Sequence, residues 1–84
     1  MSMRCVVYVL RSESTERLYI GHTADLDRRL SEHRSGQARS TRGRGPWGLV
    51  AARPFLDRSA AMAEERRLKA LKSPVRVLES VATW

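Results

Sequence analysis

The first third of the chain alternates apolar runs with polar breaks, a pattern typical of β-strands. Met3–Arg11 is rich in valine around a central tyrosine and predicts a strand. The polar segment Ser12–Glu16 predicts a turn, and Arg17–His22, closed by Gly21, predicts a short second strand. Because the two runs are close in sequence, an antiparallel hairpin is the simplest pairing.

A helical pattern follows the second strand. Thr23 or Asp25 can cap a helix that runs to about Ser35, where Gly36 supplies a C-terminal stop. Leucines at positions 26 and 30 lie on one stripe of this helix, so it is expected to pack on the sheet through that stripe.

A glycine- and arginine-rich segment separates this helix from the next strand. Gln37–Gly48 has few apolar residues and predicts an exposed loop. Trp47 and Leu49–Arg53 predict a third strand, and Pro54 is expected to end it.

A second, longer helix is predicted near the C-terminus. Asp57 or Ser59 can cap it, and it reaches about Lys72, where Ser73-Pro74 stops it. Val75–Val81 is apolar and predicts either a strand or a final helical turn. The predicted order is therefore β-β-α-β-α with an undecided last element. It indicates an α/β (α+β) fold with a small three-stranded antiparallel sheet flanked by helices.

Length and composition narrow the class of protein. The 84 residues suit one domain spanning positions 1–84, and the 42% hydrophobic content favours a packed fold over disorder. No apolar run is long enough for a membrane span, and the N-terminus does not resemble a signal peptide. The single cysteine, Cys5, excludes an internal disulfide and does not suggest a zinc site. We therefore expect a cytoplasmic protein that does not enter membranes.

The charge is strongly positive and unevenly placed. Sixteen Lys+Arg against nine Asp+Glu give a net charge of +7, and only two of the basic residues are lysines. No acidic residue lies between Glu32 and Asp57, a stretch that contains Arg39, Arg42 and Arg44. Because the guanidinium group can bind phosphate through two hydrogen bonds, this stretch favours nucleic-acid binding. The alternative is a generally basic protein whose arginines are solvated surface.

Two tyrosines lie on the predicted hairpin strands. Tyr8 and Tyr19 can approach each other once the strands pair. A tyrosine hydroxyl can accept a proton only if nearby positive charge lowers its pKa from about 10. The alternative is two aromatic residues that fill one face of the sheet.

Three further side chains are candidates for chemistry. Arg29 and His33 are four residues apart, so they share a helix face at the border of its apolar stripe. The alternative is two amphipathic side chains whose tips reach water. Glu65 lies within the apolar stripe of the second helix, where an unpaired carboxylate is costly. It needs either an arginine in a buried salt bridge or a hard cation such as Mg²⁺.

These residues resemble the GIY-YIG nuclease family in type and spacing. Val6-Val7-Tyr8 stands in place of GIY, with valine instead of the first glycine, and Tyr19-Ile20-Gly21 matches YIG in full. Arg29 and His33 follow at the family's spacing. Glu65 occupies the place of the family's glutamate on the later helix. The small stand-alone members are similar in two more stretches, SGQARSTRGRGPWGLV and SAAMAEERRLKALK.

The resemblance implies a mechanism and a set of residue roles. Tyr8 would be the general base or would position the attacking water, and Tyr19 would hydrogen-bond the water or the phosphate. Arg29 would stabilise charge on the phosphate, with His33 assisting. Glu65 would hold Mg²⁺ or Mn²⁺. The basic loop, with Arg39, Arg42 and Arg44, would contact the nucleic-acid backbone without sequence preference.

The resemblance also implies a function, a DNA endonuclease of repair or processing that is structure-selective or weakly sequence-specific. It leaves room for a partner protein that directs the nuclease to its target, and it implies no particular oligomeric state. One alternative is a nucleic-acid-binding module of the same fold that does not cut. Another is a small basic protein bound to RNA or the ribosome. Cys5, Trp47 and Trp84 are most simply packing residues, although Trp47 can also stack on a base.

Overall fold

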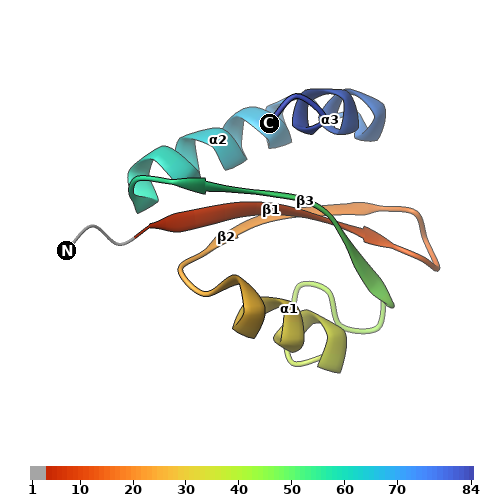
Figure 1. Ribbon diagram of the computed structural model, residues 1–84. Coiled ribbons are helices and arrows are strands. Elements are labelled where there is room, and N and C mark those ends of the chain that lie inside the picture. The colour runs from red at the N-terminus through yellow and green to blue at the C-terminus, as the bar shows by residue number, and fades with distance from the viewer. Residues whose placement is uncertain (1–3) are drawn as a thin grey trace.

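The computed structural model describes residues 4–84. Within them the chain forms the strands β1 (Cys5–Ser12), β2 (Leu18–Thr23) and β3 (Trp47–Phe55) and the helices α1 (Leu26–Ser35), α2 (Arg58–Ala70) and α3 (Pro74–Val81). The sheet order is β2-β1-β3, and β1 pairs antiparallel with both neighbours. Helices α2 and α3 cover one face of the sheet, whereas α1 and the loop before β3 lie on the other (Figure 1). The predicted three-stranded antiparallel α+β fold is confirmed.

The central strand β1 is covered on both faces, which explains its continuous apolar sequence. Successive side chains of a strand point to opposite faces. Cys5, Val7 and Val9 therefore pack in one core cluster with residues of α2 and α3, namely Ala61, Leu68, Val77 and Val81. Tyr8 and Leu10 point the other way and pack in a second cluster with Leu30 and Trp47. The candidate chemistry of Tyr8 is thereby directed toward α1.

The helix ends follow the capping chemistry predicted from the sequence. Asp25 caps α1 by accepting a hydrogen bond from the backbone N–H of Arg28, 3.1 Å away. Gly36 ends the same helix with a φ of 80°, a left-handed conformation that glycine adopts without strain. Asp57 caps α2 by accepting from the N–H of Ala60 at 2.8 Å. These caps fix where both helices start relative to the sheet.

The third strand is longer than predicted. It begins with Trp47-Gly48 and continues through Pro54 to Phe55, so the expectation that Pro54 ends the strand is wrong. Because β3 is an edge strand, it needs hydrogen bonds on one side only, and a proline there is tolerated. The first strand ends at Ser12, and its predicted start at Met3 lies outside the described residues.

The apolar C-terminal segment forms the helix α3 rather than a strand. Ser73 caps it through a hydrogen bond from the N–H of Arg76, and Pro74 occupies its first turn. Helix α2 stops at Ala70, earlier than predicted, since Lys72 adopts a left-handed φ of 52° that separates the two helices. None of the helices in residues 4–84 is long and apolar enough to cross a bilayer.

Candidate functional site

Three of the predicted site residues meet on the face of the sheet that α1 covers. Tyr8 comes from β1, Tyr19 from β2 and His33 from α1. The ring centroids of the two tyrosines are 6.2 Å apart, and that of His33 lies 5.7 Å from Tyr8 and 4.9 Å from Tyr19. The predicted approach of the tyrosines across the hairpin is therefore confirmed. All three rings also contribute to packing, as the alternative reading of the tyrosines expected.

Gly21 makes room for this arrangement. It lies opposite Tyr8 in the antiparallel register. A Cβ atom at Gly21 would lie 2.7 Å from the Tyr8 hydroxyl oxygen, 2.9 Å from its Cζ and 3.0 Å from Cε1 of Tyr19. Because these distances are shorter than van der Waals contact, any larger residue would displace both rings. Gly21, the last residue of the YIG motif, thus leaves the space that the Tyr8 ring occupies.

A chain of buried hydrogen bonds starts at the Tyr8 hydroxyl. That hydroxyl lies 2.9 Å from Nε2 of His33, and Nδ1 of His33 lies 2.7 Å from Oγ1 of Thr41. Oγ1 of Thr41 in turn lies 3.5 Å from the carbonyl oxygen of Ala38, which can only accept. We therefore assign the imidazole proton to Nδ1, where it donates to Thr41, so that Nε2 accepts from Tyr8. The sequence gives no direct sign of Thr41, because an isolated threonine in a glycine-rich loop has no distinguishing pattern.

Burial controls the protonation of this chain. Tyr8, His33 and Thr41 are only 1%, 3% and 1% exposed. Burial, with a smaller contribution from the positive charge of Arg29, lowers the pKa of His33 below its usual 6.5, which keeps the imidazole neutral. Burial raises the pKa of Tyr8 to about 12, although Arg29 acts to lower it. The requirement of a lowered Tyr8 pKa is thus not met in the free protein, since burial outweighs the nearby cation.

Arg29 joins the same cluster from the edge of α1. Its guanidinium interacts with the hydroxyls of Tyr8 and Tyr19 and with Glu32, and these contacts, with Tyr8 the largest, raise its pKa. Nη1 of Arg29 lies 3.0 Å from Oε1 of Glu32. The side chain is 32% exposed, so it is open to solvent while it contacts the tyrosines. The predicted position at the border between helix and sheet is confirmed.

Glu65 lies on α2, on the opposite face of the sheet from α1. Its Oε1 accepts a hydrogen bond from Nδ1 of His22 at 2.7 Å, and its Oε2 accepts one from Nζ of Lys69 at 2.7 Å. An arginine was one of the two partners expected from the sequence, and this expectation is wrong. Residue 22 follows the YIG motif and faces α2 because strand side chains alternate. That position is the signal by which His22 could have been found.

The negative charge of Glu65 affects the pKa of Tyr8. Burial acts to raise the pKa of Glu65, but Lys69 and His22 outweigh it, so the pKa falls below its usual 4.5 and the carboxylate stays ionised. The same negative charge adds to the raised pKa of Tyr8, although burial is the main cause. Glu65 therefore belongs to the electrostatic surroundings of Tyr8.

If a divalent cation binds at Glu65, this residue is its single carboxylate ligand. Residues 4–84 contain no group of three or more His, Cys, Asp or Glu side chains that could hold a metal ion. Glu65 is ionised and 16% exposed, and its partner Lys69 is 56% exposed, so the ammonium group can move aside. Mg²⁺ keeps most of its water ligands and is often held by one or two carboxylates. The donor set therefore agrees with Mg²⁺ or Mn²⁺ and not with a closed protein cage.

The loop between α1 and β3 was predicted to be exposed, but only part of it is, since Ala38 and Thr41 are buried and anchor it to the core. Arg39, Arg42 and Arg44 are all exposed, and Nε of Arg42 donates to the carbonyl oxygen of Gly36 at 2.8 Å. The loop carbonyl of Arg44 accepts hydrogen bonds from two serine side chains, those of Ser12 at the end of β1 and of Ser14 in the turn that follows. The three arginines therefore lie on a loop whose backbone is fixed by hydrogen bonds.

The remaining candidates are packing residues. Trp47 is buried, and its Nε1 donates to the carbonyl oxygen of Thr41 at 3.0 Å, so its ring fills the core. Cys5 is also buried. Trp84 packs against the core cluster that contains Ala61 and Leu68 of α2, and its Nε1 donates to Oε2 of Glu64 at 2.9 Å. These contacts agree with the packing roles expected from the sequence.

Comparison with known proteins assigns the family. The family model described as the GIY-YIG catalytic domain matches residues 4–77. UPF0213 proteins of Oceanobacillus iheyensis and Natronomonas pharaonis are 44% and 47% identical over 66 residues, which cover 77% of this chain and 76% of each relative. The solution NMR structure of a UPF0213 protein from Bacillus halodurans is 39% identical, with a TM-score of 0.61, and the match covers 96% of this chain and 85% of that one. The chain therefore belongs to the GIY-YIG family, and its relatives named here are UPF0213 proteins.

Proposed function

We propose that the protein is an endonuclease that hydrolyses phosphodiester bonds in DNA with the help of Mg²⁺ or Mn²⁺. Structure-selective or weakly sequence-specific cutting in cytoplasmic DNA repair or processing fits its small size and net charge of +7. The observation that carries the proposal is the buried chain from the Tyr8 hydroxyl through His33 to Thr41, because it offers a path for a proton.

The proton path follows from the assigned tautomer. The attacking water gives a proton to the Tyr8 oxygen as Tyr8 gives its own proton to Nε2 of His33. The water becomes a nucleophilic hydroxide, Tyr8 stays neutral and His33 becomes an imidazolium whose Nδ1–H remains bonded to Thr41. This sequence avoids a free tyrosinate, which the Tyr8 pKa of about 12 makes costly. His33 is thus the final proton acceptor.

Arg29 and Tyr19 would bind the phosphate. The pair of Arg29 with Glu32 is partly exposed, and such pairs contribute at most about 1 kcal/mol. A phosphate with two charge-assisted hydrogen bonds can therefore replace Glu32 as the partner of Arg29. As Arg29 turns to the phosphate, it releases the Tyr8 hydroxyl for contact with water. The Tyr19 hydroxyl, which also interacts with Arg29, would donate to a phosphate oxygen.

Glu65 would hold the cation, with Lys69 displaced into solvent. A bound divalent cation would supply positive charge to stabilise the pentacovalent phosphate. His22 orients the carboxylate through its hydrogen bond to Oε1 and leaves lone pairs of both oxygens for ligation. The exposed guanidinium groups of the basic loop would contact the backbone of the DNA without sequence preference.

A binding module that does not cut is the second candidate. Two observations favour it, since both carboxylate oxygens of Glu65 already accept hydrogen bonds, from His22 and Lys69, and Tyr8 is 1% exposed. In that case the buried cluster only supports the fold, and the exposed arginines of the basic loop bind the nucleic acid.

One assay separates the two candidates. Branched, nicked and single-stranded DNA, and RNA, are incubated with the protein in Mg²⁺, in Mn²⁺ and in EDTA. The matched variants are Glu65→Gln and Glu64→Gln, neighbours on α2 of which Glu64 pairs with Arg67 instead. We expect metal-dependent cutting by the wild type and by Glu64→Gln, and none by Glu65→Gln. Tight binding without cutting on every substrate would establish the binding module.

A further inference from the structure

A cavity opens at the end of the sheet where β1 starts, β2 finishes and α2 begins. Its volume is about 270 Å³, comparable to roughly nine water molecules in the liquid. Six residues line it: Arg4, Cys5, His22, Thr23, Ala24 and Arg58. Figure 1 shows the start of β1 and the start of α2 at the same end of the molecule, far from α3.

The lining of this cavity is cationic. Arg4 and Arg58 contribute guanidinium groups, and no carboxylate is among the lining residues. Within residues 4–84 neither arginine forms a salt bridge, so their charges are not cancelled by an acidic partner. Guanidinium groups bind phosphate oxygens through paired hydrogen bonds, and here two of them are available.

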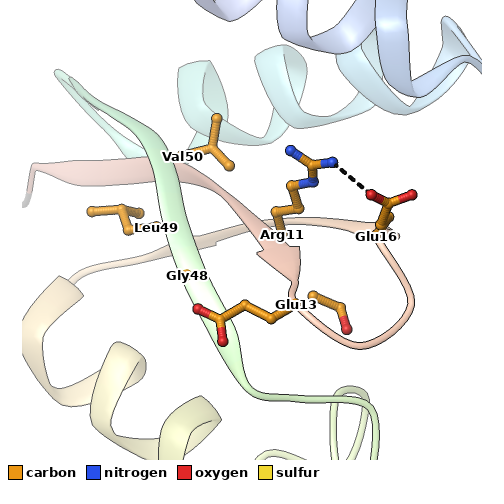
Figure 2. A pocket seen from close by; sticks show the side chains of 7 residues that line it. Arg11, Glu13, Glu16, Gly48, Leu49 and Val50 are labelled. Carbon is orange, nitrogen blue, oxygen red and sulfur yellow. Dashed lines mark hydrogen bonds and ion pairs between the residues drawn. The ribbon is translucent and has the colours of Figure 1, made fainter.

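The cavity at the opposite end of β1 differs in charge. It measures about 370 Å³ and includes Arg11, Glu13 and Glu16 in its lining. Figure 2 shows the Arg11 guanidinium directed at Glu16, and the two groups are 3.2 Å apart. Because two carboxylates accompany one paired arginine there, that cavity does not favour an anion.

The cationic cavity adjoins Glu65. His22 lines it and also hydrogen-bonds Glu65 at 2.7 Å. Burial raises the pKa of the Cys5 thiol, while Arg58 acts to lower it and Glu65 adds to the rise, so both charges lie near the start of β1. The carboxylate of Glu65 is paired with Lys69, so it does not neutralise the two arginines of the cavity.

We propose that this cavity is a subsite for a backbone phosphate of the bound strand, beside the phosphate that is cut. The statement that a cut phosphate lies next to this subsite rests on the proposed function. Binding of the backbone phosphate itself needs neither metal nor cleavage. Arg58 and Arg4 would bind the phosphate oxygens, and the strand would pass from Glu65 across His22 into the cavity. Such a contact sets the register of the strand on the protein and carries no sequence information.

Binding without metal tests the subsite. The affinity of a labelled single-stranded DNA with a 5′-hydroxyl end is measured in EDTA by fluorescence anisotropy over a series of salt concentrations. Each phosphate contact adds about 0.7 to the slope of log affinity against log salt for a single strand. We expect Arg58→Ala to bind more weakly and to lose about 0.7 from this slope. The matched control Arg76→Ala, at an exposed arginine on α3 that forms no salt bridge within the described residues 4–84, should keep the wild-type slope.

Arg4→Ala repeats the test at a residue that precedes β1 and therefore does not depend on the folding of α2. Equal slopes for wild type, Arg58→Ala and Arg4→Ala would overturn the subsite. A loss seen only with a 5′-phosphorylated strand would also overturn it, because the site would then bind a terminal phosphate. Absence of cutting with Mg²⁺, alongside the expected slopes, would reject the nuclease and retain the subsite.

Discussion

Replacement of Thr41 by valine removes one hydroxyl group and keeps the shape of the side chain. In the wild type, Oγ1 of Thr41 accepts the Nδ1–H of His33 at 2.7 Å, and both residues are buried. Without that acceptor the Nδ1–H is buried and unpaired, which costs about 1–3 kcal/mol. For a chain of this size each kcal/mol lowers the melting temperature by about 4–8 °C. We therefore expect Thr41→Val to melt at least about 4 °C below the wild type.

Thr41→Ser is the matched control, since it keeps the hydroxyl and loses a methyl group. Thermal unfolding measures the stability of both variants, and NMR of the His33 ring nitrogens reports the tautomer. We expect a proton on Nδ1 in the wild type and in Thr41→Ser, and loss of that single tautomer in Thr41→Val. Thr41→Val with unchanged melting and an unchanged Nδ1–H signal would refute the assigned chain of hydrogen bonds. Such a result would leave His33 without the group that we infer positions it.

Three further predictions concern packing and pH. Gly21→Ala should lower the free energy of unfolding by about 1–3 kcal/mol, because its Cβ would overlap the Tyr8 ring. The control Gly48→Ala should lower it less, since the nearest atom beyond its chain neighbours would be 4.0 Å from its Cβ. Equal losses in the two variants would contradict the role of Gly21. The lowered pKa of His33 means that the unfolded chain binds more protons below pH 6.5, so the wild type should lose stability on acidification through that value. His33→Gln should lack this component when denaturation is followed at several pH values. The lowered pKa of Glu65 stabilises the fold above pH 4.5, and this stabilisation is lost at lower pH. The difference in unfolding free energy between the wild type and Glu65→Gln should therefore shrink in acid. A difference that stays constant with pH would exclude an ionic origin.

The elements of the fold were predictable where local chemistry decides them. Asp25, Gly36 and Asp57 satisfy the ends of helices through their own side chains or backbone, so their positions are local signals. The path of β3 through Pro54 was not predictable, because it depends on β3 being an edge strand. The helix α3 was equally undetermined, since the same apolar spacing suits a strand until Val77 and Val81 find the core.

The candidate site divides in the same way. Spacing across the hairpin was enough to predict that Tyr8 and Tyr19 lie close together, and spacing along one helix put Arg29 and His33 on one face. The contact between these two pairs depends on how α1 packs on the sheet. Lys69 follows Glu65 by one helical turn, so this pairing could have been predicted from the sequence. His22 lies on a strand 43 positions earlier, and the packing of α2 on the sheet brings it to Glu65. The pKa of Tyr8 depends on a balance between burial and Arg29 that spacing does not contain.

Single-turnover cutting by Tyr8→Phe tests the central claim most directly. Phenylalanine keeps the ring that fills the space above Gly21 and removes only the hydroxyl that begins the proton path. With protein in excess over one labelled DNA substrate and Mg²⁺ present, we expect the wild type to cut and Tyr8→Phe to be slower by about 10²-fold or more, with DNA binding unchanged. Equal rates for the two proteins would contradict a reaction that passes through the Tyr8 hydroxyl.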